Sequence, residues 1–456
     1  MMVSTIRSEG LAHLSYFVSS GEEALVIDPR RDCNVYLELA MREGSPITHI
    51  LETHRNEDYV IGSVELQNKI PDVRIGHSAE TSFKYGEDNL QDEDTFKIGR
   101  IKVTCIHSPG HTDDSMCFAI SDLDVSDDYL LLFTGDTLFV NEVGRTDLVD
   151  IKKHEGMSRK LYQSLHEKIL PLPDGIIIHP GHGAGSVCGG AIGSRDFTTL
   201  GYERQNNIWL DMNEEDFIQG KLRQKLTRAP YFKRCERLNT HGPPLLPPLS
   251  ELKQFDVDEL ESFIDEPNTD LLDTRPAYDF VKSHIPRSIS LDLGHMGLFA
   301  GWVLEEQKRF AFLLNSSSDF EEACGMLYRV GLDNVVGALK GSIDDWSNAG
   351  KTLDSLPVYA FEDIRSQTTD IQIFDVRQTH ETEGDYIKLS INTPLTSLTE
   401  GVHEHNKNSK IATICPAGVR STTGSSILRR QGFMKAGVTE EGLNGWKQRG
   451  YPTESE

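Results

Sequence analysis

Three side chains in the first third of the chain have the types and the setting to hold one metal ion. His54 lies in THRNEDYV, His111 in SPGHTDDS and Asp136 in FTGDTLF. Each follows a short apolar run with the length of a β-strand, so all three could converge at one edge of a sheet. Two imidazoles and one carboxylate are the ligands of non-haem Fe(II) oxygenases, in which other positions stay open for substrate and O2. This set therefore points to oxidation at one metal ion.

The neighbours of His54 argue against a second metal ion. In metallo-β-lactamase-type hydrolases the corresponding segment reads T-H-x-H-x-D-H and supplies ligands for two ions. Here Asn56 and Tyr59 stand where the second and third histidines would be. A neutral amide and a phenol are poor ligands for zinc, which takes Cys, His and carboxylates. The two replacements point away from hydrolysis at two metal ions.

The bulk composition excludes several classes of partner. A chain of 456 residues suggests about three domains. The net charge of -25 argues against broad binding to nucleic acid or to an anionic membrane. No apolar stretch approaches the roughly 20 residues that span a bilayer, and the N-terminus lacks the layout of a signal peptide. Seven cysteines without paired spacing indicate free thiols. We therefore expect a cytoplasmic protein with no nucleic-acid or membrane partner.

Short apolar runs that end in His, Asp, Gly or Pro recur through residues 1–235. The clearest are EALVIDP, ITHILETH, IKVTCIHSPGH, YLLLFTGD and GIIIHPGHG. Helical patterns such as CNVYLELAMREG and KKHEGMSRKLYQSLHEKI lie between them. Buried strands that deliver polar residues at their C-terminal ends are how a layered α/β scaffold assembles a site. The proline-rich stretch HGPPLLPPLSE at 241–251 then predicts a semi-rigid linker.

Beyond this linker the sequence repeats itself at an offset of roughly one hundred residues. LLDTRPAYDF returns as IFDVRQTHET, LYRVGLDNV as LRRQGFMKA, and GSIDDW as EGLNGW. Three matches in the same order predict two copies of one α/β domain. The expected organisation is a metal domain at 1–240, a second domain at 252–352 and a third at 357–456.

The first 210 residues resemble one enzyme family through specific motifs. IDPRRD, ETHRNEDYVIG, SPGHTDDS, FTGDTLFVNEVGRTDL and HPGHGAGSVCGGAIG are similar to motifs of the persulfide dioxygenases. The resemblance implies a metallo-β-lactamase fold, an αββα sandwich, with one Fe(II) per chain on His54, His111 and Asp136. It also implies oxidation of a low-molecular-weight thiol persulfide by O2, which releases sulfite and the parent thiol. Members of the family often form homo-oligomers, although the sequence indicates no particular interface.

Two further residues match metal positions in the hydrolase relatives of this family. Asp58 and His182 correspond to ligands of the second metal ion there. With Asn56 and Tyr59 beside them, that ion lacks enough ligands. We expect Asp58 and His182 either to orient the ligands or a water molecule from behind, or to support the loops by hydrogen bonds.

Candidates for substrate binding have an alternative role in each case. Arg145 in GRTDL can hold a substrate carboxylate or organise the site through an ion pair. Tyr202 and Arg204 in TLGYERQNN resemble positions near the family's thiol-substrate pocket. Cys188 in GSVCGG either faces the site or packs in the core.

The last domain contains a second candidate centre. The segment ATICPAGVRSTTGSS resembles the active loop of rhodaneses, C-x-x-G-x-R, with Cys415 as nucleophile. Backbone amides, a helix N-terminus and Arg420 would stabilise a thiolate or the outer sulfur of a persulfide. Gly418 permits tight curvature, and Arg420 can pair with an anion such as sulfite. Asp375 and Arg377 match the D-x-R signature of rhodanese domains, for which we expect a structural role.

The first copy lacks this chemistry. When the copies are aligned on LYRVG and LRRQG, Cys415 corresponds to Leu314 and Arg420 to Asp319. The loop LNSSSDF has no nucleophile, and it carries an acid at the position of the arginine. Cys324 falls in the following helix and is expected in the core. The middle domain is therefore predicted to be an inactive rhodanese-like domain that serves as a spacer or docking surface.

The whole chain resembles a persulfide dioxygenase–rhodanese fusion with a degenerate middle domain. This predicts an enzyme, a non-haem iron persulfide dioxygenase and thiosulfate sulfurtransferase of sulfide and persulfide detoxification. Sulfur carried by Cys415 would pass to sulfite to give thiosulfate, or the reverse, and the sequence does not fix the direction. One alternative is a zinc thioesterase of the glyoxalase II type with an appended sulfurtransferase. Another is a sulfur carrier or scaffold in which only Cys415 acts.

Overall fold

A computed structural model describes residues 1–366, 370–398, 402 and 405–455. The chain divides into two compact units. Unit 1 contains residues 1–246 and 328–331, and unit 2 contains residues 247–327 and 332–456. Among the described residues, no helix combines the length and the apolar character that crossing a membrane requires. The boundaries of the three domains expected from the sequence stay predictions.

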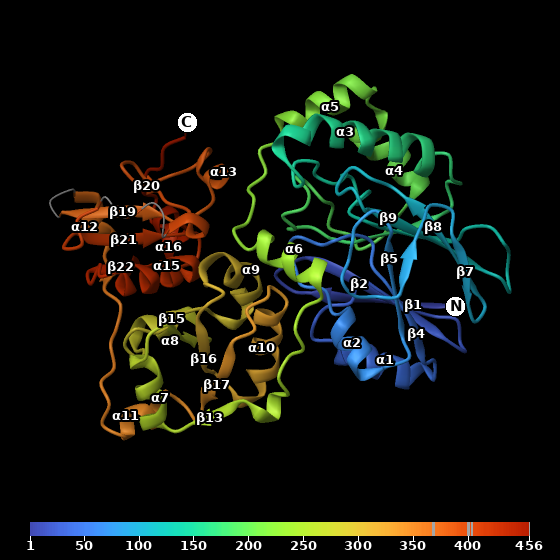
Figure 1. Ribbon diagram of the computed structural model, residues 1–456. Coiled ribbons are helices and arrows are strands. Elements are labelled where there is room, and N and C mark those ends of the chain that lie inside the picture. Colours follow the sequence, from blue (N-terminus) through green and yellow to red (C-terminus); the bar gives the residue numbers. More distant parts are fainter. Residues whose placement is uncertain (367–369, 399–401, 403–404, 456) are drawn as a thin grey trace. The chain divides into compact units, whose positions relative to one another are not determined.

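Unit 1 is built on two six-stranded sheets (Figure 1, blue to green). The first sheet has the strand order β1 (Met2–Ser8), β2 (His13–Ser19), β3 (Ala24–Ile27), β4 (Ile47–Leu51), β5 (Arg74–Ser78), β6 (Asp88–Leu90). The second has the order β12 (Thr198–Thr199), β11 (Ile177–Pro180), β10 (Leu131–Gly135), β9 (Met116–Asp122), β8 (Ile101–His107), β7 (Thr95–Ile98). All five apolar runs singled out in the sequence are strands, namely β3, β4, β8, β10 and β11.

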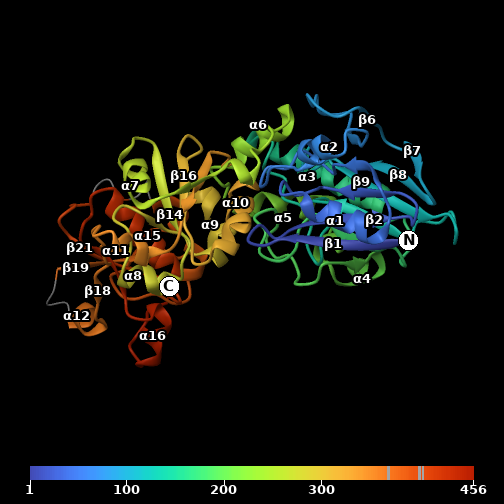
Figure 2. The same ribbon diagram turned by 90° about the horizontal axis from the view of Figure 1, so that it is seen from below.

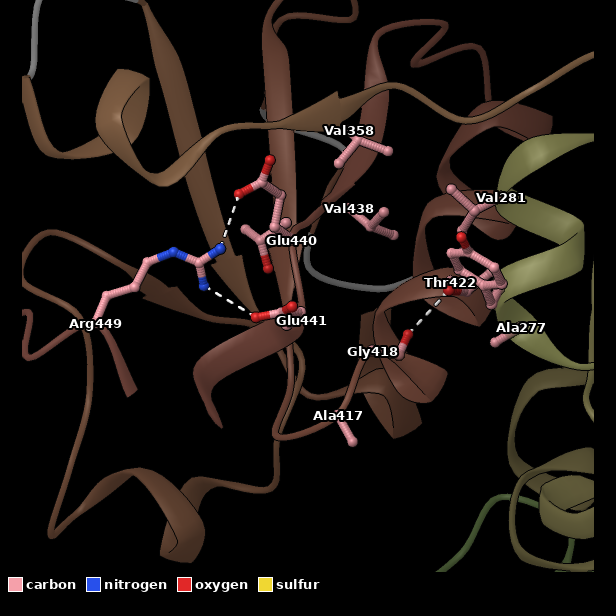
Figure 3. A pocket seen from close by; sticks show the side chains of 12 residues that line it. Ala277, Val281, Val358, Ala417, Gly418, Thr422, Val438, Glu440, Glu441 and Arg449 are labelled. Carbon is pink, nitrogen blue, oxygen red and sulfur yellow. Dashed lines mark hydrogen bonds and ion pairs between the residues drawn. The ribbon is translucent and has the colours of Figure 1, made fainter. Parts of the chain in front are cut away.

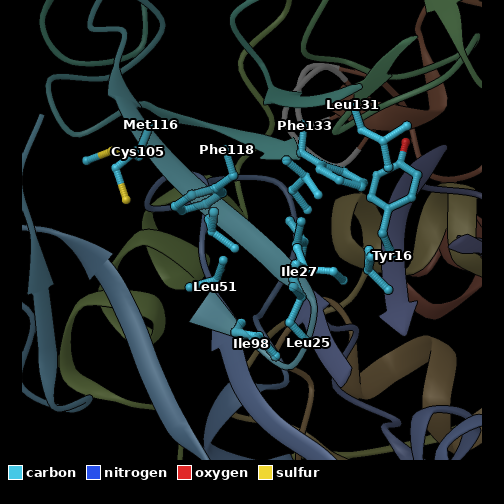
Figure 4. Packing of buried hydrophobic residues seen from close by; sticks show 14 of the residues in the cluster. Tyr16, Leu25, Ile27, Leu51, Ile98, Cys105, Met116, Phe118, Leu131 and Phe133 are labelled. Carbon is cyan, nitrogen blue, oxygen red and sulfur yellow. The ribbon is translucent and has the colours of Figure 1, made fainter. Parts of the chain in front are cut away.

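The two sheets bury one apolar core between their inner faces (Figure 4). Leu25 and Ile27 reach this core from the first sheet, and Phe118 and Phe133 reach it from the second. Val26, between Leu25 and Ile27, points to the opposite face and joins an outer cluster. Because side chains alternate along a strand, a run that is apolar at every position is a strand buried on both faces.

Helices cover both outer faces of this pair of sheets (Figures 1 and 2). On the first sheet, Tyr36 of α1 (Asn34–Glu43) and Leu66 of α2 (Ser63–Lys69) pack in the outer cluster. On the second, α3 (His154–Gln163), the π-helical turn Ser164–Ile169 that follows it and α5 (Glu214–Arg223) do the same. Unit 1 also contains α4 (Leu200–Asn206) and α6 (Phe232–His241). The predicted αββα sandwich is confirmed.

Unit 2 contains two parallel five-stranded sheets with the same topology. The first has the order β13 (Lys253–Phe255), β17 (Val335–Leu339), β16 (Arg309–Leu313), β14 (Thr269–Asp273), β15 (Ile289–Ser290). The second has the order β18 (Val358–Tyr359), β22 (Ala436–Thr439), β21 (Lys410–Ile414), β19 (Ile371–Asp375), β20 (Ile391–Asn392). The identical order confirms the duplication that the sequence repeat predicts.

Helices flank both sheets of unit 2. The first copy contains α7 (Val257–Asp265), α8 (Ala277–Lys282), α9 (Leu293–Val303), α10 (Phe320–Tyr328) and α11 (Ile343–Asn348). The second contains α12 (Phe361–Ser366), α13 (Thr379–Thr382), α15 (Val419–Arg430) and α16 (Gly442–Gln448). In both views α15 lies beside α8, and the two helices are in contact (Figures 1 and 2). Arg430 on α15 pairs with the largely buried carboxylate of Asp270, which fixes the two copies to each other.

Candidate functional site

The three candidate metal ligands lie in loops that leave the C-terminal ends of strands from both sheets. His54 follows β4, His111 follows β8 and Asp136 follows β10 directly. All three are buried, with at most 3% of their surface exposed. The two sheets meet here, since the Met116 N–H donates to the Thr53 carbonyl at 2.7 Å. The edge that the strand pattern predicted is therefore the edge where the site forms.

Their free ligand atoms face one another across a short distance. His111 Nε2 lies 3.4 Å and His54 Nε2 lies 4.0 Å from Asp136 Oδ2. Two atoms that each bind one ion at about 2.1 Å are at most about 4.2 Å apart, so both separations suit a shared metal ion. All three atoms are buried and have no hydrogen-bond partner among the described residues, which costs roughly 1–3 kcal/mol per group if nothing else binds them. The residues fit a bound metal ion.

The protonation states also suit metal binding. Burial lowers the pKa of His54 to about 3 and lowers the pKa of His111, so both imidazoles are neutral at neutral pH. Burial opposes ionisation of Asp136, but the charge of His182 and its hydrogen bond outweigh it and lower the pKa of Asp136. Neutral imidazole and ionised carboxylate are the forms that coordinate a metal ion.

Hydrogen bonds at Nδ1 of His54 and His111 determine which ring nitrogen is available to bind a metal ion. Thr53 donates its hydroxyl proton to Asp28 Oδ2 at 2.7 Å, so its oxygen accepts from His54 Nδ1 at 3.0 Å. His111 Nδ1 donates to the Arg145 carbonyl at 2.9 Å. In both rings the proton is placed on Nδ1 by this network, and the Nε2 lone pair is left for the metal. The tautomers needed for coordination are built into the fold.

A second group of potential ligands adjoins the first. His182 Nδ1 donates to Asp136 Oδ1 at 2.8 Å, which leaves Asp136 Oδ2 for the two histidines. On its other side, His182 Nε2 forms an ion pair with Asp58 Oδ2 at 2.8 Å. Cys188 completes this group, in which the atoms of Asp58, His182 and Cys188 lie within 4.8 Å of one another. His182 thus orients Asp136 from behind.

The residues that replace the two hydrolase histidines are used within the fold. Asn56 Nδ2 donates to the His54 carbonyl at 3.2 Å. Tyr59 is buried and stacks on His13 with ring centroids 3.8 Å apart. Between them in sequence, the buried Glu57 carboxyl lies 3.8 Å from His111 Nε2, and its oxygens have no hydrogen-bond partner in the part of the chain that the structure describes. Burial raises the pKa of Glu57 well above its usual value, and the charge of Arg55, whose Nη2 lies 3.7 Å from Glu57 Oε1, opposes this rise.

The second centre surrounds Cys415, at the start of the loop after β21. The sulfur accepts hydrogen bonds from the N–H of Gly418 at 3.1 Å and of Ser421 at 3.4 Å. Gly418 adopts a left-handed φ of 95° as the residue before α15, which turns these amides toward the sulfur. Arg420 forms a two-point ion pair with Glu381, with distances of 2.6 and 2.8 Å. The guanidinium expected to bind an anion therefore already has a carboxylate partner.

The middle copy has the same frame without the nucleophile. Asp273 pairs with Leu313 across the first sheet, as Asp375 pairs with Ile414 across the second, so Leu314 and Cys415 occupy equivalent positions. The Asp319 carboxylate accepts from the backbone N–H of Ser316 at 3.1 Å, as part of a helix cap. Cys324 is buried in α10, as expected. The loop holds its shape by capping and carries no thiol.

Comparisons with known proteins agree with this division of the chain. The model of the metallo-beta-lactamase superfamily matches residues 9–182, and that of the rhodanese-like domain matches residues 256–349 and 361–449. The chain is a metallo-beta-lactamase superfamily domain fused to two rhodanese-like domains.

Individual relatives cover different parts of this fusion. The persulfide dioxygenase ETHE1, mitochondrial, of Bos taurus is 29% identical over 202 residues, which are 43% of this chain and 70% of the relative. The mitochondrial hydroxyacylglutathione hydrolase of Saccharomyces cerevisiae is 31% identical over 188 residues, 38% of this chain and 62% of the relative. A crystal structure of a metallo-beta-lactamase from Staphylococcus aureus subsp. aureus COL is 28% identical, has a TM-score of 0.66 and covers 74% of this chain and 98% of its own. This likeness covers more than the metallo-beta-lactamase domain alone.

The expected substrate-binding residues have structural contacts in the metallo-beta-lactamase domain. Arg145 is buried; its guanidinium pairs with Asp147 at two points and donates to the carbonyls of Val187, Leu226 and Thr227. These contacts favour the ion-pair role that the sequence left open. Tyr202 lies under the guanidinium of Arg195, and Arg204 pairs with Asp174. A direct role for Arg145, Tyr202 or Arg204 in substrate binding stays a prediction.

Several residues at the two centres were not singled out from the sequence. Asp28 and Thr53 orient His54, Glu57 adjoins His111, and Glu381 holds Arg420. A signal was available for the first pair only, since Asp28 ends the strand motif EALVIDP and Thr53 directly precedes a ligand. For Arg377 the expected structural role fits the contacts, because it pairs with Asp375 and donates to the carbonyls of Glu381 and Asp385.

We expect Thr53→Val to lower the affinity for the metal ion roughly 10–100-fold, because His54 loses the oxygen that fixes its ring. Metal content after dialysis against a graded chelator measures this. Thr48→Val is the matched control, since Thr48 Oγ1 makes the same kind of hydrogen bond to His49 Nδ1 at 2.9 Å in β4, and His49 is not a candidate ligand. Equal metal retention in both variants would contradict the role given to Thr53.

Proposed function

We propose that the metallo-beta-lactamase domain uses one iron ion to oxidise a low-molecular-weight thiol persulfide with O2. The observation that carries the proposal is the set of three buried, unpaired atoms, His54 Nε2, His111 Nε2 and Asp136 Oδ2, that face one another. Two histidines and one carboxylate form the ligand triad of non-haem Fe(II) oxygenases. Similarity to persulfide dioxygenases supports the substrate class. The balanced reaction is RSSH + O2 + H2O → RSH + SO3²⁻ + 2 H⁺.

The protein's own part in this reaction is to hold the ligands and to exclude water. Iron, when bound, supplies the one-electron chemistry that O2 needs to react with a persulfide. Thr53 and the Arg145 carbonyl hold the two imidazoles, and His182 holds Asp136. None of the three ligands needs to change its hydrogen bonds to coordinate. Such preorganisation lets persulfide and O2 react as neighbours in one site.

The last rhodanese-like domain carries the second proposed activity. The Gly418 and Ser421 amides and the N-terminus of α15 stabilise negative charge on Cys415 and on an outer sulfur bound to it. Sulfite attacks that outer sulfur through its own lone pair. A new S–S bond forms, the bond to Cys415 breaks, and thiosulfate leaves together with the Cys415 thiolate. The reverse sequence loads Cys415 from thiosulfate, and no oxidant is consumed in either direction.

A second candidate function has support from one feature of the site. Asp58, His182 and Cys188 form another cluster of potential ligands beside the first, and similarity to a hydroxyacylglutathione hydrolase adds weight to it. Two metal ions would then hydrolyse a thioester. Asn56 and Tyr59 count against this function, because a neutral amide and a phenol are poor zinc ligands. The Asn56 amide nitrogen donates to the His54 carbonyl, and the Tyr59 ring stacks on His13.

Metal analysis separates these two functions. For protein prepared without oxygen, we expect about one iron ion per chain, because three ligand atoms converge on one point. Elemental analysis of the purified protein measures the ratio. About two zinc ions per chain, with thioester hydrolysis and no O2 uptake on a persulfide, would establish the hydrolase instead.

His111→Ala is expected to abolish persulfide-dependent O2 uptake and to reduce the iron content, because one of the three ligands is lost. An oxygen electrode with glutathione persulfide measures the uptake. His49→Ala, a change to a half-buried histidine of β4 that bonds Thr48, is the control that should retain both properties. Unchanged O2 uptake in His111→Ala would leave Cys415 as the only active centre.

Cys415→Ser is expected to leave O2 uptake at the wild-type level while formation of thiosulfate from persulfide and sulfite is lost. The reason is that the hydroxyl cannot carry the transferred sulfur. Ion chromatography of thiosulfate measures the product. Cys324→Ala, which alters the buried cysteine of the middle copy, serves as control. Loss of both activities in Cys415→Ser would show that the two centres are not separate.

A further inference from the structure

A cavity of about 560 Å³ lies beside the Cys415 loop (Figure 3). This volume is in the range of roughly 300–1,000 Å³ that is typical of pockets for organic ligands. It is far larger than sulfite or thiosulfate needs. Its lining residues come from both rhodanese-like copies: Ala277, Tyr278, Val281, Val358, Ala417, Gly418, Thr422, Val438, Thr439, Glu440, Glu441, Arg449.

One residue joins this cavity to the reactive sulfur. Gly418 lines the cavity, and its N–H donates to Cys415 Sγ at 3.1 Å. Thr422 on the first turn of α15 also lines it, and its hydroxyl donates to the Gly418 carbonyl at 2.9 Å. A molecule in the cavity therefore lies against the loop that would carry the transferable sulfur.

The middle copy supplies an apolar wall. Ala277, Tyr278 and Val281 of α8 line the cavity. Figure 3 shows Ala277 and Val281 across the cavity from Val358 and Val438 of the last copy. Tyr278 is 70% exposed and Val358 is 52% exposed, so the cavity is faced by apolar surface that the fold itself does not bury. Lys282 lies over the Tyr278 ring at 3.7 Å, and it also faces Asp279 at 3.8 Å. The inactive copy thus offers a surface for the carbon part of a ligand.

The remaining wall carries a surplus of negative charge. Arg449 Nη1 lies 3.0 Å from Glu441 Oε2, and Arg449 Nη2 lies 3.4 Å from Glu440 Oε2 (Figure 3). One guanidinium therefore forms ion pairs with two carboxylates. The group keeps one net negative charge. Such a wall attracts a ligand with an ammonium group and disfavours one with an additional carboxylate.

The acids belong to the active copy alone. Aligning GSIDDW with EGLNGW places Lys340 and Gly341 of the middle copy at the positions of Glu440 and Glu441. Gly341 has a φ of 109°, and Glu441 has a φ of 52°, a left-handed conformation that is strained for a residue with a side chain. Strain of this kind persists where the surroundings or the function require it. The last copy therefore has a glutamate at a position where a glycine would adopt a positive φ without strain.

We propose that this cavity binds a low-molecular-weight aminothiol, a thiol with a protonated amine near its sulfur, as the sulfur acceptor or donor of Cys415. The inference rests on the proposed sulfurtransferase role of Cys415. The carbon skeleton packs on Tyr278 and Val281, and the ammonium group faces Glu440 and Glu441. The aminothiol thiolate attacks the outer sulfur of the Cys415 persulfide. A new S–S bond forms, the old S–S bond breaks, Cys415 leaves as thiolate, and the aminothiol persulfide is released.

The test uses three thiols of similar size as acceptors, namely cysteamine, 2-mercaptoethanol and 3-mercaptopropionate. The full-length protein is first loaded with sulfur on Cys415 from thiosulfate, and loading is verified by the mass of the intact protein. Transfer rates then give kcat/KM for each thiol. The preference for cysteamine over 3-mercaptopropionate is compared between variants, which cancels the intrinsic reactivity of each thiol.

In the double variant Glu440→Gln, Glu441→Gln we expect this preference to fall roughly tenfold, because the negative charge of the wall is removed. Tyr278→Ala should raise KM for all three thiols while the rate of loading from thiosulfate is unchanged. Glu383→Gln and Met434→Ala, at exposed positions of the last copy outside the cavity, are the matched controls.

An unchanged preference in the double variant, or an unchanged KM in Tyr278→Ala, overturns the aminothiol site while the sulfurtransferase role stands. Failure of the wild-type protein to take up sulfur on Cys415 overturns the proposed activity itself. The loading step therefore separates the two failures.

Discussion

The site in the metallo-beta-lactamase domain depends on how the buried carboxylate of Asp136 is balanced. A buried, ionised carboxylate is costly unless charge and hydrogen bonds compensate for it. His182 compensates at Oδ1, and the two ligand histidines face Oδ2. The Gly181 backbone lies so close to the Asp136 carboxylate that a side chain has no room there, because a Cβ on Gly181 would lie 2.7 Å from Asp136 Oδ1. A metal ion is the natural third partner of this arrangement, since it is the one that also satisfies both imidazoles.

The strands and the ligand positions of this site could be predicted from the sequence, but the hydrogen bonds and ion pairs around them could not. Apolar runs that end in His or Asp identified β4, β8 and β10. They also placed His54, His111 and Asp136 at one edge of the sheets, because the C-terminal ends of these strands lie there for any conformation of the loops. The partners of polar groups were harder to predict. Arg145 donates hydrogen bonds to carbonyls in the distant segment at 226–227. Arg420 pairs with Glu381, which lies 39 residues earlier in the chain. Such pairings depend on how loops fold back, and hydrophobic periodicity carries no information about this.

Comparison of the two rhodanese-like copies shows which interactions they share and which occur only beside Cys415. Both copies keep an aspartate at the end of a central strand that binds the arginine two residues later, Asp273 with Arg275 and Asp375 with Arg377. Both also keep the same strand order and register. Around the cysteine loop the copies differ in chemically important residues, since Leu314, Asp319 and Gly341 stand in place of Cys415, Arg420 and Glu441. The middle copy therefore lacks the cysteine and arginine of the last copy, and its helix α8 contacts α15 of that copy.

The surface of α8 that lines the cavity would give the middle copy a part in the proposed chemistry of the whole chain. If its wall and the acids of the last copy hold an aminothiol beside Cys415, the product of transfer from thiosulfate is an organic persulfide, the substrate class proposed for the iron site. Oxidation there returns the same thiol together with sulfite. Adding the two reactions gives S2O3²⁻ + O2 + H2O → 2 SO3²⁻ + 2 H⁺, in which the thiol does not appear. The aminothiol would then be a carrier used many times, and a site that selects one carrier is more useful than one that accepts any thiol. This would give a domain without a nucleophile a use beside one that has Cys415, since selection among thiols needs a second wall that the small cysteine loop does not provide.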